Sequence, residues 1–73
     1  MSADQDRFYA ECEDFRVEFG LTVSRFGRLA CRQPAFLFQL RRGRAPSART
    51  IERVRAFMRS AREEHQRALK GNL

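Results

Sequence analysis

Residues 21–50, LTVSRFGRLACRQPAFLFQLRRGRAPSART, contain the pattern that decides the expected fold. Thr22 is a good N-cap for a helix over 23–30, because its hydroxyl can accept from a free backbone N–H of the first turn. Gly27 inside this helix costs stability unless another segment packs closely against it. Apolar residues at helical spacing form the predicted inner face: Val23, Phe26, Leu29 and Ala30.

A second short helix is predicted over 34–42, after a three-residue break at 31–33. Pro34 suits the first helical position, where its missing N–H costs nothing, and Gly43 ends the helix. Its inward residues are Phe36, Leu37 and Leu40. These neighbours place Phe38 outward, where it would be a base contact, an anchor for another protein or a partly buried ring.

Two longer helices are predicted on either side of this pair. The first spans 4–19 and ends before Gly20, and the last spans about 48–69. Their apolar stripes are Phe8, Cys12, Phe15 and Phe19 in the first helix, and Ile51, Val54, Met58, Ala61, His65 and Ala68 in the last. Since no strand pattern occurs, we expect an all-α, compact four-helix domain over 1–73 with a long C-terminal helix.

Composition excludes several classes of protein. The chain has 73 residues and is 42% hydrophobic, which suits one small folded domain. It lacks a long apolar run, and its first residues are polar and acidic, so we expect a cytoplasmic, nucleoid-associated protein with no membrane segment. Cys12 and Cys31 are expected to be reduced core thiols, and one histidine is too few for a metal site.

An enzyme is not expected either. The sequence has no nucleophile–base set, no paired carboxylates in a plausible pocket and no glycine-rich phosphate loop. We therefore expect no cofactor and no small-molecule ligand.

Charge is distributed very unevenly along the chain. Residues 1–20 carry a net charge of −4, and residues 21–73 carry +10. Leu21–Arg49 contains seven arginines and no acid. A polyanionic partner explains such a segment, and arginine suits both phosphates and guanine edges. The alternative is that these arginines only form a solvated surface.

The segment Leu21–Met58 resembles the Cro/C1-type (lambda-repressor-like, XRE-type) helix-turn-helix family. The matching residues are Leu29-Ala30, Leu37, Leu40, Gly43, Pro46 and Thr50, with Ile51 and Val54 behind them. The resemblance implies a helix-turn-helix motif at about 22–42, whose second helix enters the major groove of double-stranded DNA.

The resemblance also implies which residues contact DNA. Base contacts would be made by Gln33, Ala35, Phe38 and Gln39. Phosphate contacts would be made by Thr22, Ser24, Arg25, Arg41, Arg42 and Arg44. Contacts of the second kind set affinity and salt dependence rather than sequence choice.

The last helix is longer than a small domain needs to cover its own core. A helix of this length spans ~30 Å, so we expect its surplus to form a homodimer. The expected interface residues are Met58, Ala61, His65 and Ala68. A two-fold dimer predicts a palindromic operator. The acidic first helix is a second candidate surface, for another protein.

Three functions fit these features. The first is a sequence-specific transcriptional regulator, most simply a small repressor that covers a promoter as a dimer. The second is a protein-interaction module on the same fold, such as an anti-activator or an antitoxin-like partner. The third is an excisionase-like accessory DNA-binding protein. The acid-free stretch favours the first.

Overall fold

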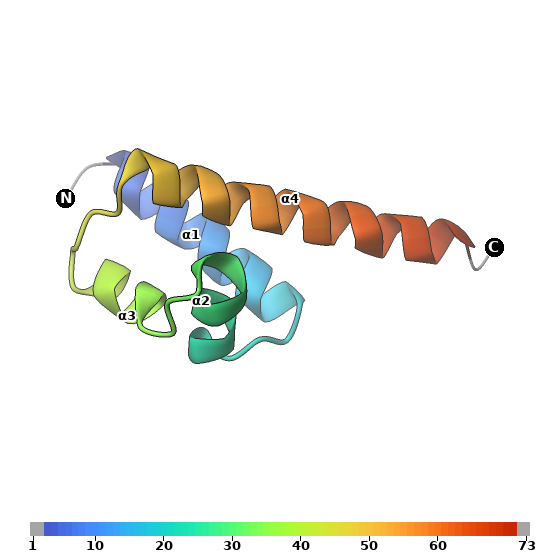
Figure 1. Cartoon of the computed structure of the whole chain (residues 1–73), viewed down its shortest axis with the longest axis horizontal. Coiled ribbons are helices and arrows are strands. Elements are labelled where there is room, and N and C mark those ends of the chain that lie inside the picture. The colour runs from blue at the N-terminus through green and yellow to red at the C-terminus, as the bar shows by residue number, and fades with distance from the viewer. Residues whose placement is uncertain (1–2, 72–73) are drawn as a thin grey trace.

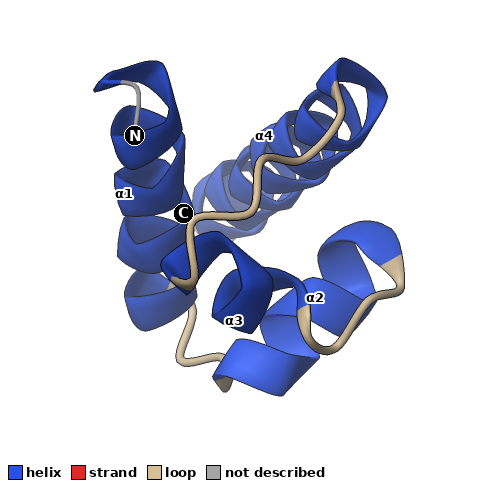
Figure 2. Ribbon diagram, turned by 90° about the vertical axis from the view of Figure 1, so that its left-hand side faces the viewer, coloured by secondary structure: helices blue, strands red, loops and turns tan. Residues whose placement is uncertain are grey.

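The computed structural model describes residues 3–71, so both ends of the expected 1–73 domain lie outside the described range. These residues form four helices and no strand, which confirms the all-α, four-helix prediction. The helices are α1 (Ala3–Glu18), α2 (Val23–Cys31), α3 (Phe36–Arg41) and α4 (Ala48–Gly71). In Figure 1, α4 runs beside α1 and continues past the rest of the molecule. Figure 2 shows α2 and α3 packed together on one side of that pair.

The boundaries of α2 and α3 follow from local chemistry. Thr22 caps α2 as predicted, because its Oγ1 accepts from the backbone N–H of Arg25 at 3.1 Å. The helix ends at Arg32, which adopts the left-handed conformation at φ 59°. The connection to α3 is longer than predicted, because Pro34 lies in a turn closed by the Phe36 N–H on the Gln33 carbonyl at 2.9 Å. Pro34 is therefore not the first residue of α3.

The core is assembled from all four helices. Its buried side chains are Phe8, Cys12, Phe15, Phe26, Ala30, Cys31, Phe36, Leu37, Leu40, Val54 and Met58. Aromatic rings meet at its centre, where Phe15 packs against Phe26 at 5.9 Å and against Phe57 at 5.5 Å between ring centroids. The predicted inner faces of α1 and α3 are thereby confirmed, including a buried Phe36 and an outward Phe38.

Two predicted positions differ from the structure. Leu29 is 49% exposed, because Phe26 and Ala30 turn the inner face of α2 away from it. Met58 is only 5% exposed, so its side chain belongs to the core of one chain and cannot form a dimer surface.

Helices α1 and α4 run in the same direction, side by side (Figure 1). Two ion pairs show the register: Arg55 contacts Glu11 at 3.2 Å, and Arg62 contacts Glu18 at 3.0 Å. Arg62 also lies over the Phe15 ring at 5.4 Å. Two of the six acids of α1, Glu11 and Glu18, thus pair with arginines of α4, and Glu13 pairs with Arg16 and Arg41. No helix in residues 3–71 is long and apolar enough to cross a bilayer.

Both cysteines are buried free thiols, as predicted for core residues. Burial raises the pKa of Cys12 to about 12 and raises that of Cys31 as well. Because the thiolate is the reactive species, about one Cys12 in ten thousand would be ionised at pH 8. We expect a disulfide-exchange reagent to label neither thiol of the native protein within minutes, and to label both rapidly in concentrated urea. Rapid labelling of Cys12 in native buffer, located by mass spectrometry, would contradict this packing.

Candidate nucleic-acid interface

The first polar surface lies at the start of α2, where several of the predicted phosphate contacts occur. A shallow hollow there is lined by Thr22, Ser24, Arg25, Arg28 and Leu29. Three predicted phosphate contacts therefore lie together. Arg28, which was not predicted as a phosphate contact, lines the same hollow. It lies one helical turn after Arg25, a spacing that places both residues on one face of a helix.

A second hollow lies between α3 and the start of α4. Its lining includes Gln33, Gln39 and Arg44 from the predicted contact set, together with Phe36, Ala45, Pro46, Ser47 and Thr50. Two hydrogen bonds fix the backbone at Arg44. Its N–H donates to the Gln39 carbonyl at 3.0 Å, and its carbonyl accepts from Gln5 Nε2 at 3.2 Å. Gln33 and Gln39, the two glutamines predicted as base contacts, thus line the same hollow.

Two hydroxyl groups in this second hollow were not predicted as site residues. The Ser47 Oγ accepts from the backbone N–H of Thr50 at 3.2 Å and lies 3.0 Å from the Thr50 Oγ1. Ser47 thereby caps the first turn of α4, a role that serine commonly takes at the start of a helix. Both side chains face the same hollow as Gln33 and Gln39.

Phe38 and Ala35 lie on the exposed side of the α2–α3 pair. Phe38 is 47% exposed, and Ala35 is exposed in the turn before α3. The guanidinium of Arg41 lies 5.9 Å from the centroid of the Phe38 ring. All four predicted base contacts are therefore accessible at least in part, with Gln39 half-buried.

Arg41 differs from the other predicted phosphate contacts, because its guanidinium is bound by α1. Its Nε donates to the Tyr9 hydroxyl at 2.6 Å, and its Nη2 donates to Glu13 Oε1 at 2.9 Å. Hydrogen bonds first from Arg16 and then from Arg41 lower the pKa of Glu13 below its ordinary value of 4.5. Arg41 is thus 42% exposed but bound to Glu13, whereas Arg42 and Arg44 are exposed and form no ion pair with a described acid.

Ion pairing divides the arginines into two groups. Within residues 3–71, acids of α1 engage Arg16, Arg41, Arg55 and Arg62. The exposed arginines that form no ion pair with a described acidic residue are Arg25, Arg28, Arg32, Arg42, Arg44 and Arg49, together with Arg7, Arg53, Arg59 and Arg67. Six of these ten arginines lie between residues 25 and 49, a stretch that contains no acidic residue. The other four lie on α1 and α4, which also carry acids.

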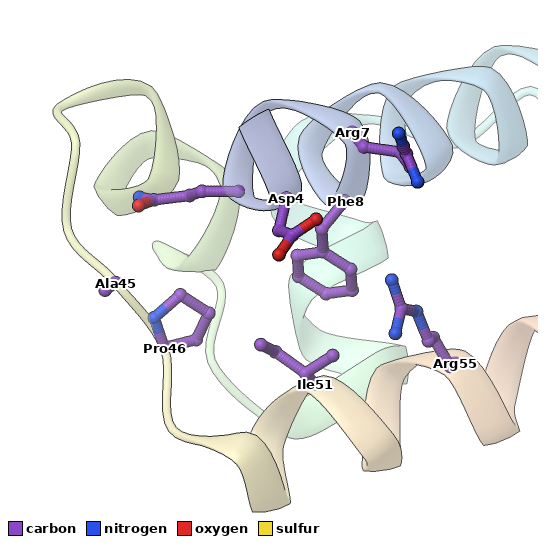
Figure 3. Close-up of a pocket in the computed structure, with 8 residues that line it drawn as sticks. Asp4, Arg7, Phe8, Ala45, Pro46, Ile51 and Arg55 are labelled. Carbon is purple, nitrogen blue, oxygen red and sulfur yellow. The ribbon is translucent and has the colours of Figure 1, made fainter. Parts of the chain in front are cut away.

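Another hollow lies between the first half of α1 and the start of α4 (Figure 3). It is lined by Asp4, Gln5, Arg7, Phe8, Ala45, Pro46, Ile51 and Arg55. It shares only Ala45 and Pro46 with the hollow that holds Gln33 and Gln39, so the 45–46 loop separates the two. None of the predicted contact residues lines it.

Of the remaining residues predicted for a dimer interface, Ala61 packs against the core of its own chain, and His65 and Ala68 lie beyond it on α4. Ala61 is half-buried, and His65 packs its ring edge against Phe19 of the same chain at 5.7 Å. Ala68 is exposed, as is every residue from Arg62 to Gly71. Leu69, at 56% exposed, adds a large apolar side chain to this surface.

Comparison with known proteins gives no match to this chain among family models, curated proteins or solved structures. No group of three or more metal-ligating side chains is assembled in the described part of the chain.

Proposed function

We propose that this protein binds double-stranded DNA in a sequence-specific manner, as a small transcriptional repressor. The observation that supports this most directly is the sorting of the arginines. Acids of α1 pair with Arg41, Arg55 and Arg62, whereas the acid-free stretch 21–49 carries six exposed arginines without an ion pair to a described acid. One of these six, Arg44, lines the hollow that holds Gln33 and Gln39. A surface that combines positive charge with amide side chains suits a DNA backbone with base edges beside it.

In this proposal α2, the turn at 32–35 and α3 act as a helix-turn-helix motif, with α3 in the major groove. Gln33 or Gln39 would bond adenine through both amide atoms, and Phe38 or Ala35 would contact a thymine methyl group. Phosphates would be held by Thr22, Ser24, Arg25, Arg28, Arg42 and Arg44. Arg41 leaves this set because α1 occupies its guanidinium.

Repression would follow from a dimer that covers a palindromic promoter site in the cytoplasmic nucleoid. The exposed part of α4 supports a dimer, since its ten residues from Arg62 to Gly71 are all exposed, with Arg62 and His65 contacting Glu18 and Phe19 of the same chain. Because Met58 is buried, the dimer surface that we propose is formed by Ala61, His65, Ala68 and Leu69. Two copies joined there would address two half-sites about 34 Å apart, one turn of DNA.

The experiment is selection of bound duplexes from a random pool, followed by fluorescence anisotropy with the selected duplex and a scrambled one. Gln39→Ala is expected to reduce the preference for the selected duplex by about 5- to 150-fold, the value of a bidentate base contact. Arg42→Ala is expected to weaken binding to both duplexes alike. It should also make the slope of log K against log salt concentration shallower by about one.

Gln66→Ala and Arg67→Ala are matched controls, because both side chains are exposed on the projecting part of α4. Neither is expected to change the preference between the two duplexes. If the pool yields no preferred sequence and all duplexes bind equally weakly at physiological salt, the repressor proposal is rejected.

A protein-interaction module is the second candidate, and one observation favours it. Phe38 and Leu29 are both about half exposed on the α2–α3 side of the molecule. Apolar side chains on such a surface suit a protein partner as well as a thymine methyl group. The same selection experiment separates the two, because a module of this kind would show no sequence preference for DNA.

A further inference from the structure

One carboxylate of α1, that of Glu13, binds two arginines, Arg16 from α1 itself and Arg41 from α3. Its Oε1 accepts from Arg41 Nη2 at 2.9 Å. Its Oε2 accepts from Arg16 Nη2 at 2.7 Å and from Arg16 Nε at 3.1 Å. The Glu13 side chain is 21% exposed, so these bonds are partly shielded from water. Charge-assisted bonds of this kind are the stronger ones in proteins.

The two arginines connect Glu13 to both ends of the α2–α3 segment. Arg16 Nη1 donates to the Leu21 carbonyl at 3.0 Å, directly before the Thr22 cap of α2. Arg41 is the last residue of α3. Glu13 therefore links the point where α2 begins with the point where α3 ends.

Tyr9 completes this cluster. Its hydroxyl accepts from Arg41 Nε at 2.6 Å and donates to Glu13 Oε1 at 3.3 Å. The guanidinium carbon of Arg41 lies 5.9 Å from the ring centroids of both Tyr9 and Phe38. Arg41 thus connects a ring on α1 with the exposed ring of α3.

Helix α3 needs support of this kind. It has six residues, and no side chain caps its first turn. A helix this short is not stable by its own hydrogen bonds. Its orientation is set by the burial of Phe36, Leu37 and Leu40 on one side and by the bonds of Arg41 at its end.

We propose that Tyr9, Glu13 and Arg41 form a clamp that positions α3 and Phe38 for sequence discrimination. This inference rests on the proposed DNA-binding function. The clamp acts in two ways, because it fixes the end of the recognition helix and also withdraws one arginine from sequence-independent contact with phosphates. Glu13, Tyr9 and Arg41 are positioning residues in this account, since they act through the side chains that contact bases.

The test is Glu13→Gln, with Glu18→Gln as the matched control. Both changes remove one negative charge from α1, but Glu18 pairs with Arg62 at the far end of that helix. Glu13→Gln is expected to lower the ratio of affinities for selected and scrambled duplexes by about tenfold. Because Arg41 then lacks its Glu13 partner, affinity for the scrambled duplex should rise. The slope of log K against log salt concentration for that duplex should also become steeper by about one. Glu18→Gln should leave the ratio unchanged.

Tyr9→Phe and Arg41→Gln keep the test decisive if Glu13→Gln fails to fold by circular dichroism. Tyr9→Phe removes only the hydroxyl and is expected to lower the ratio by about threefold, through the lost bond to Arg41. Arg41→Gln is expected to lower the ratio without steepening the salt dependence. The clamp is overturned if the folded variants at Glu13, Tyr9 and Arg41 discriminate as well as Glu18→Gln does.

A failure of the proposed function gives a different result. In that case the unaltered protein itself prefers no duplex. The structural part of the clamp is then decided by urea denaturation of Glu13→Gln, Arg41→Gln and the double variant. Shifts of the urea midpoint that are not additive support the clamp, and additive shifts reject it.

Discussion

Replacing Phe15 with alanine is expected to remove a large share of the protein's stability and to lower its urea midpoint strongly. The Phe15 side chain is 1% exposed, and its ring stacks on Phe19 with 4.2 Å between centroids. It also meets the rings of Phe26 and Phe57. Truncation of a buried phenylalanine costs about 3–5 kcal/mol. A chain of this length is stable by only about 4–11 kcal/mol in total, so this one change removes a large share of its stability.

The measurement is urea denaturation followed by far-ultraviolet circular dichroism. Phe38→Ala is the matched control, because it deletes the same ring from a position that is 47% exposed. The control is expected to change the free energy of unfolding by no more than about 0.5 kcal/mol, as most surface changes do. Similar urea midpoints for the two variants would show that the packing around Phe15 is not the one described.

Much of this core is visible in the sequence, because helical periodicity fixes a face directly. Phe8, Cys12 and Phe15 recur at intervals of four and three residues, and all three are buried. The stop after α1 was equally visible, since Gly20 adopts a positive φ of 65° that glycine accepts without strain. Long helices with a continuous stripe leave little choice of inner face.

The short helices leave more choice, and there the predictions were less accurate. In the nine-residue α2, moving the inner face by one residue rotates it by about 100°. Leu29 was therefore as plausible as Cys31, and packing against α3 and α4 decided for Cys31. Likewise, Pro34 fits a turn as well as a first helical position. The left-handed Arg32 that lengthens the connection has no signal in the sequence, because arginine has no preference for that conformation.

The candidate site was predictable in residue types but not in partners. Residues 21–49 contain seven arginines and no acid, and the first predicted helix is acidic. The ion pairs between α1 and the later helices join residues 28 to 44 positions apart. Only the folded arrangement shows that Arg41 is bound to Glu13 while its neighbour Arg42 forms no ion pair with a described acid. Composition therefore overstated the charge that is free to meet a phosphate.

Gly27→Ala is expected to destabilise the protein strongly, although alanine is the better helix former by about 1 kcal/mol. A Cβ at this position would collide with the carbonyl oxygen of Gln33 and would lie 3.3 Å from the Cβ of Phe36. The first of these is a backbone atom, which cannot rotate away as the end of a long side chain can. Gln33 is also held in place on both sides, because its carbonyl accepts from the Phe36 N–H at 2.9 Å and its N–H donates to the Gly27 carbonyl at 3.1 Å. Overpacking costs about 1–3 kcal/mol, and this rigid contact places Gly27→Ala at the upper end of that range or above it.

Gly71→Ala is the control, since a Cβ there meets no atom within 4 Å and the residue lies in the last turn of α4. Its thermal midpoint should be unchanged or slightly higher, whereas that of Gly27→Ala should fall by roughly 10 °C or more. Gly27→Ala should also lose preference for a selected DNA duplex under conditions where it remains folded. The added methyl group would force the turn at 32–35 away from α2, and Gln33 with it, so the two glutamines would no longer line one hollow. A folded Gly27→Ala protein that keeps its full preference would show that the close approach at Gly27 does not set the arrangement of the proposed base contacts.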